Sequence, residues 1–132
     1  MADTFSIDGS WTCEPRSTGQ QSSDPSLDAP LNERVALAAK EQGTYTLSSA
    51  SVVPVSLGGI DVAVGAAVVV LRAVGGKVKA RLTSADGAVQ CVPVDPLCIV
   101  ISGSVPFTAI DLTRDPGIST AVVVKVFLGQ KA

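Results

Sequence analysis

The sequence contains no histidine. This absence removes the side chain that most often serves as a general base near neutral pH and as a transition-metal ligand. It also removes the usual activator of a serine or cysteine nucleophile. No GxSxG motif occurs, and "GGK" at residues 75–77 lacks the spacing of a phosphate-binding loop. The sequence therefore predicts a protein that is not an enzyme and that holds no cofactor or metal.

The net charge is also small, with a formal value of only −2 at pH 7. A basic surface of the kind that binds nucleic acid is not expected at this charge. The most apolar run, Val62 to Leu71, is about half of the ~20 residues needed to cross a bilayer, so no membrane span is expected. The opening "MADTFSIDGS" lacks the basic and apolar parts of a signal peptide. We therefore expect a protein made in the cytoplasm.

The cysteines are three in number, an odd set without CxxC spacing: Cys13, Cys91 and Cys98. An odd set argues against a secreted disulfide framework. Reduced thiols in the cytoplasm behave as small hydrophobes, so we expect all three side chains to be buried.

Aromatic residues make up only 4 % of a chain that is 46 % hydrophobic and contains twenty valines. Valine favours the pleated surface of a sheet, and 12 glycines and 8 prolines supply turns. Strands are expected at 44–48, 52–57, 96–102, 106–113 and 119–129, the last being apolar on both faces as in a central strand. Residues 31–43 fit a helix or a strand, and the surroundings favour a strand. The predicted fold is an all-β antiparallel sandwich or jelly-roll-like domain.

Two glycines, Gly75 and Gly76, are typical of a two-residue hairpin turn. A hairpin there pairs Arg72 with Lys79 and produces one wholly apolar face. That face consists of Val69, Leu71, Ala73, Val78, Ala80 and Leu82. A second hairpin is expected at Asp86-Gly87, with a type I′ turn. It would complete a three-stranded meander near 66–74, 77–84 and 88–94. It would also place Cys91 on the apolar face.

The other face of this predicted ribbon is basic. It carries Arg72, Lys77, Lys79 and Arg81. Because like charges directly opposite each other destabilise a sheet, either nearby carboxylates or an acidic partner should neutralise them. The face is thus either solvated or a docking surface for a partner.

Four aspartates, Asp86, Asp95, Asp111 and Asp115, could suggest a carboxylate pair or a calcium site. They do not have the spacing of a calcium loop. Three of them precede glycine or proline, which is ordinary turn chemistry.

The N-terminal segment alternates apolar and polar residues, which indicates a half-buried strand containing Phe5, Ile7 and Trp11. A polar loop, residues 14–30, follows it, and a loop of this length is usually functional or disordered. We therefore divide the chain into an arm, residues 1–30, and a β-sandwich domain, residues 31–132. The arm strand could return to its own sheet or reach a neighbouring subunit.

From residue 31 to the C-terminus, the order of strands and turns resembles that of small β-sandwich virion proteins of tailed bacteriophages. The stretches "GGKVKARLTSADGAVQCVPVD" and "SVPFTAIDLTRDPGISTAVVVKVFLG" carry the resemblance. It implies a structural subunit of the virion that decorates or cements a capsid, or builds a tail, baseplate or fibre. Its partners would be other copies of itself, often as trimers, and the major capsid or tail protein. A glycan-binding sandwich is the alternative, although sugar sites usually need exposed aromatic residues.

Overall fold

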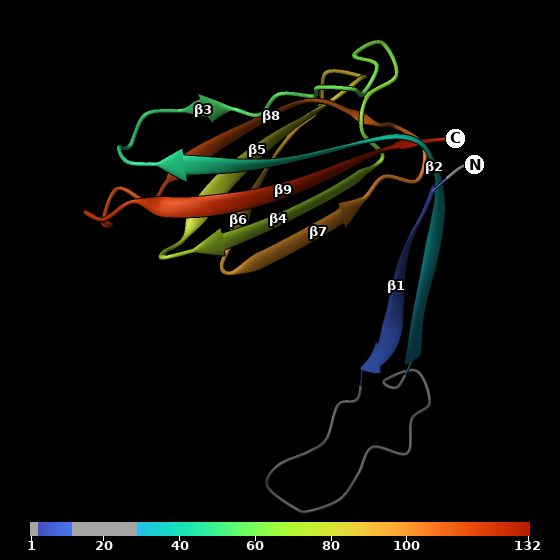
Figure 1. Cartoon of the computed structure of the whole chain (residues 1–132), viewed down its shortest axis with the longest axis horizontal. Coiled ribbons are helices and arrows are strands. Elements are labelled where there is room, and N and C mark those ends of the chain that lie inside the picture. Colours follow the sequence, from blue (N-terminus) through green and yellow to red (C-terminus); the bar gives the residue numbers. More distant parts are fainter. Residues whose placement is uncertain (1–2, 12–28) are drawn as a thin grey trace, which may run out of the picture.

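Two antiparallel β-sheets pack face to face, and a hairpin extends away from them (Figure 1). The computed structural model describes residues 3–11 and 29–132. Within these residues every strand pairing is antiparallel and no helix occurs. The predicted all-β sandwich is confirmed. No helix in these ranges is long and apolar enough to cross a membrane.

Sheet A has the strand order β1-β2-β9-β4-β7, and sheet B has the order β3-β8-β5-β6. The strands are β1 (Asp3–Trp11), β2 (Ala29–Leu47), β3 (Val53–Pro54), β4 (Val68–Val74), β5 (Val78–Ser84), β6 (Val89–Val94), β7 (Leu97–Ile101), β8 (Phe107–Arg114) and β9 (Val122–Lys131). The ambiguous segment 31–43 is a strand, and it continues through 44–47 as part of β2. The last strand, β9, lies between β2 and β4, so its predicted central position is confirmed.

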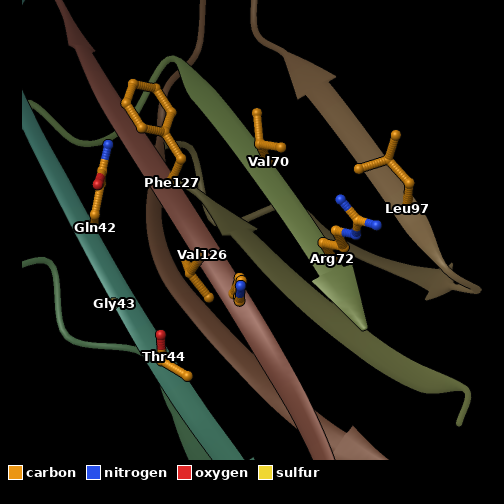
Figure 2. A pocket seen from close by; sticks show the side chains of 9 residues that line it. Gln42, Gly43, Thr44, Val70, Arg72, Leu97, Val126 and Phe127 are labelled. Atoms are coloured by element: carbon orange, nitrogen blue, oxygen red, sulfur yellow. The ribbon is translucent and has the colours of Figure 1, made fainter. Parts of the chain in front are cut away.

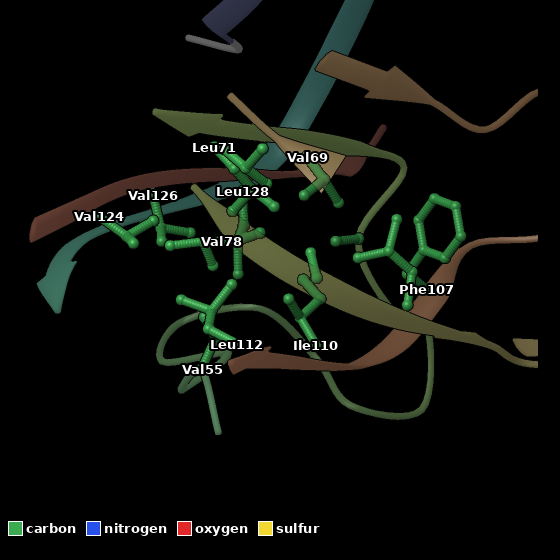
Figure 3. Close-up of a cluster of buried hydrophobic side chains, with 14 of the residues drawn as sticks. Val55, Val69, Leu71, Val78, Phe107, Ile110, Leu112, Val124, Val126 and Leu128 are labelled. Carbon is green, nitrogen blue, oxygen red and sulfur yellow. The ribbon is translucent and has the colours of Figure 1, made fainter. Parts of the chain in front are cut away.

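The core fills the space between the two sheets (Figure 3). Along β4, β5, β8 and β9 roughly alternate residues point into it, because successive side chains of a strand face opposite ways. Leu71 of β4, Leu82 of β5, Leu112 of β8 and Leu128 of β9 are completely buried there. The apolar set predicted from the sequence for β4 and β5 is buried in this core.

The predicted pairing of β4 with β5 is wrong. β4 belongs to sheet A, between β9 and β7, whereas β5 belongs to sheet B, between β8 and β6. The connection through Gly75 and Gly76 therefore crosses from one sheet to the other. Gly75 has a φ of +99°, whereas Gly76 is not in the positive-φ region.

The second predicted hairpin exists, but the two-residue loop expected at Asp86-Gly87, which would pair Ser84 with Val89, gives a register that is wrong by one residue. Thr83 pairs with Val89 and Arg81 with Cys91. The amide of Ser84 donates to the carbonyl of Ala88 across a three-residue loop. Only the glycine of Asp86-Gly87 has a positive φ, so the turn is not type I′. A slip of one residue exchanges the two faces of a strand, and Cys91 is consequently exposed instead of buried.

Candidate functional site

In the structure the strand predicted for the arm, residues 1–30, is part of a longer N-terminal hairpin, in which residues 3–11 of β1 pair with residues 29–37 of β2; from here on the arm means this hairpin. Leu37 pairs with Asp3 of β1 and also with Lys131 of β9, and after it the register of β2 shifts, so that from Ala39 onward the strand pairs with β9 alone. A bulge bends a strand and increases its twist. The arm consequently leaves the sandwich at a steep angle and extends beyond it (Figure 1). The predicted domain boundary after residue 30 falls inside β2 and stays a prediction.

The two faces of the arm differ. Phe5 and Ile7 of β1 are half-buried, as is Val35 opposite Phe5, whereas Thr4 and Ser6 are exposed. The alternation predicted for this strand is thus present where its side chains are described. The backbone of Trp11 pairs with that of Ala29. Cys13 and the loop at 14–28 lie outside the described residues.

The base of the arm contacts the outer face of sheet A. The ring of Phe5 stacks on that of Phe127, with centroids 5.7 Å apart and planes inclined by 23°. The Asp3 carboxylate forms an ion pair with the Lys40 ammonium at 2.9 Å. These contacts fix the first residues of the arm.

A shallow hollow of about 510 Å³ lies on the same outer face (Figure 2). Its lining residues come from four neighbouring strands: Gln42, Gly43, Thr44, Val70, Arg72, Leu97, Lys125, Val126 and Phe127. Two rows cross the sheet there. One row runs Gln42, Phe127, Val70, Ile99, and the next runs Thr44, Lys125, Arg72, Leu97. The hollow therefore combines apolar walls with two adjacent cations.

The predicted basic face is not a single face. Arg72 lies on sheet A, Lys79 and Arg81 lie on sheet B, and Lys77 lies in the connection between the sheets. Arg81 is opposite Asp111. A like-charge pair does exist at Arg72, but its partner across the strands is Lys125, not Lys79. Whether these cations dock a partner stays a prediction.

Replacing Arg72 with glutamate should stabilise the fold, because Lys125 would then face an opposite charge. Cross-strand pairs contribute roughly 0.2–1 kcal/mol, so we expect a gain of about that size in the free energy of unfolding. The gain should shrink with added salt, since exposed charges are screened. Lys79→Glu is the control, because Lys79 faces Thr113 and Pro93. Equal changes for both variants would show that Arg72 and Lys125 do not repel each other.

Other candidate groups have ordinary structural roles. Asp86 accepts a hydrogen bond from the Ala88 amide at 3.0 Å, and Asp115 accepts one from the Gly117 amide at 2.9 Å, as expected for turns. Cys98 is half-buried, and this burial raises the pKa of its thiol, which makes it less reactive. Residues 3–11 and 29–132 contain no cluster of three or more metal-ligating side chains.

No protein-family model matches the chain, and no match was found among curated proteins or among solved structures.

Proposed function

We propose that the chain is a non-enzymatic structural subunit that assembles with copies of itself through the arm. We further propose that this assembly belongs to the virion of a tailed bacteriophage, where the subunit decorates or cements the capsid. The arm is the observation that supports assembly. The resemblance of residues 31–132 to virion sandwiches supports the location, with a tail, baseplate or fibre as the alternative site in the particle.

The physical argument starts from the stability of the arm. An isolated two-stranded hairpin is marginal in water and needs a surface on which to pack its apolar side. In the described chain β1 pairs only with β2, and Phe5 stacks on Phe127 at the base. Beyond the base the arm extends away from the sandwich (Figure 1). Fully burying an isoleucine side chain contributes about 1.5–3 kcal/mol relative to leaving it exposed, so a neighbouring subunit that covers the exposed part of Ile7 would gain part of that free energy.

The test compares two substitutions on adjacent residues of β1. Ile7→Asp places a charge on the half-buried side of the arm, and Ser6→Asp places the same charge on the exposed side. We expect Ile7→Asp to form a smaller species than the wild type by light scattering. Ser6→Asp should keep the wild-type mass. The sandwich should remain folded in both variants, because neither residue contributes to the core between the sheets.

A wild-type chain that is monomeric at every concentration, or two variants of equal mass, would contradict assembly through the arm. The virion assignment has a separate test. Peptides of this chain should be recovered from purified particles of the phage that encodes it. Their absence from those particles, combined with retention on a glycan column, would favour the glycan-binding alternative. The aromatic ring in the hollow, Phe127, already contacts Phe5, which leaves less of it available to a sugar.

A further inference from the structure

Among the described residues β7 pairs only with β4, and its other edge supports an inference that goes beyond the arm. Sheet A ends in β1 on one side and in β7 on the other, and sheet B ends in β3 and β6. A strand at the edge of a sheet presents unpaired backbone N–H and C=O groups to any chain that can pair with them. Natural proteins usually protect such edges by shortness, charge, proline or a covering segment. Within residues 3–11 and 29–132, the four edges of the two sheets differ in that protection.

Three of the edges have an evident protection or role. β3 has only two residues, one of which is Pro54. β6 contains Pro93, which has no amide hydrogen to donate. β1 forms the outer strand of the arm. β7, with the sequence LCIVI, has five residues and contains no charge, proline or glycine.

The side chains of β7 are also apolar on the outside. Leu97 is 52 % exposed and Ile99 is 41 % exposed. Both continue the rows of the outer face of sheet A, where Leu97 is opposite Arg72 and Ile99 is opposite Val70. Cys98, by contrast, packs against the core. An unprotected backbone edge and exposed apolar side chains thus coincide on one strand.

We propose that β7 pairs with β7 of a second copy, antiparallel and about a two-fold axis, to form one continuous sheet. The sequence of β7 is self-complementary for this arrangement. With the axis at Ile99, Leu97 is opposite Ile101, and Cys98 is opposite Val100. Every cross-strand pair is apolar, and no like charges meet. Pro93 prevents the neighbouring edge of β6 from pairing in the same way, which selects β7 as the joining strand.

The experiment separates this contact from the arm by using the Ile7→Asp chain as the background. We expect that chain to remain a dimer. Adding Ile99→Lys should lower the mass twofold, to the 13.4 kDa of one chain. Adding Val89→Lys is the matched control: Val89 is 46 % exposed on the edge of β6, and this variant should stay dimeric.

Hydrogen exchange tests whether the backbone of β7 forms the contact. Amides of residues 97–101 that point away from β4 should exchange more slowly in the dimer and should lose this protection on dilution. A monomeric Ile7→Asp chain would overturn the β7 contact and leave the arm contact standing. A dimer that survives Ile99→Lys, or that leaves these amides unprotected, would also overturn it.

Discussion

Replacing Gly65 with alanine should destabilise the sandwich by about 3–4 kcal/mol, whereas the same replacement at Gly87 should cost only about 1–2 kcal/mol. Both glycines have a φ of +87°, so alanine is equally strained at the two positions. The space around them differs. A Cβ at residue 65 would lie 2.6 Å from the carbonyl oxygen of Phe107, whereas a Cβ at residue 87 would have nothing within 4 Å.

The obstruction at Gly65 involves backbone and therefore cannot be relieved by a change of rotamer. The amide of the next residue, Ala66, donates to the same Phe107 carbonyl at 2.7 Å, and the Phe107 amide donates back to Ala66 at 2.8 Å. This bridge holds the segment before β4 against the start of β8. Alanine at 65 must push these two segments apart.

Chemical denaturation measures the difference between the two variants. Both substitutions also reduce the entropy of the unfolded chain by the same amount, so this contribution cancels when they are compared. The remaining difference of about 2 kcal/mol reports the close approach at Phe107 alone. Equal losses for Gly65→Ala and Gly87→Ala would mean that the backbone of residue 65 does not lie against β8.

The strand segments and buried faces were predictable because alternation of apolar residues is a local property of the sequence. For β4 and β5, the predicted buried residues, such as Leu71 and Leu82, are completely buried. Alternation does not say whether two strands lie side by side or face each other across a core. A hairpin and a connection between sheets bury the same side chains. The two differ in a contact at Gly76, where a Cβ would lie 2.5 Å from the Ile118 side chain. Gly76 and Ile118 are far apart in the sequence, so a local pattern does not reveal this contact.

The exposure of Cys91 shows a second limit. Asp86-Gly87 correctly predicted a turn, but a two-residue loop and a three-residue loop have nearly the same sequence preferences. The choice between them moves Cys91 from one face to the other, because side chains alternate along the strand. The structure has the longer loop, in which Thr83 rather than Ser84 pairs with Val89.

The arm was partly predictable. Alternation from Phe5 to Trp11 indicated the strand, and that strand is present. Its partner was not predicted, because residues 29–30 read as the end of the polar loop and residues 31–37 as the start of the sandwich domain. β2 is 19 residues long and belongs to both units: it pairs with β1 up to Leu37 and with β9 from Leu37 onward, with a shift in register between Leu37 and Ala39. The candidate site missed by sequence reasoning is the hollow, since Arg72 and Lys125 are distant in the sequence and come together only through the pairing of β4 with β9.

A disulfide between residues 72 and 125 should form readily, whereas one between residues 72 and 79 should not. Directly opposite residues on adjacent antiparallel strands have Cα atoms about 4.5–5.5 Å apart, within the usual range for a disulfide. Arg72 and Lys125 are such a pair. Lys79 lies in the other sheet, and packed sheets are about 10 Å apart even before outward-facing side chains are considered.

The test uses a chain in which Cys13, Cys91 and Cys98 are replaced by alanine, so that only the introduced thiols can react. Arg72→Cys with Lys125→Cys should be oxidised to an intramolecular disulfide under mild oxidation, and the mass of the alkylated chain reports the yield. Arg72→Cys with Lys79→Cys should keep two free thiols. Each reduced variant should melt cooperatively, which shows that the fold is retained. The opposite result, with 72 linked to 79 and not to 125, would restore the hairpin at Gly75-Gly76, and the hollow between β4 and β9 would then not exist.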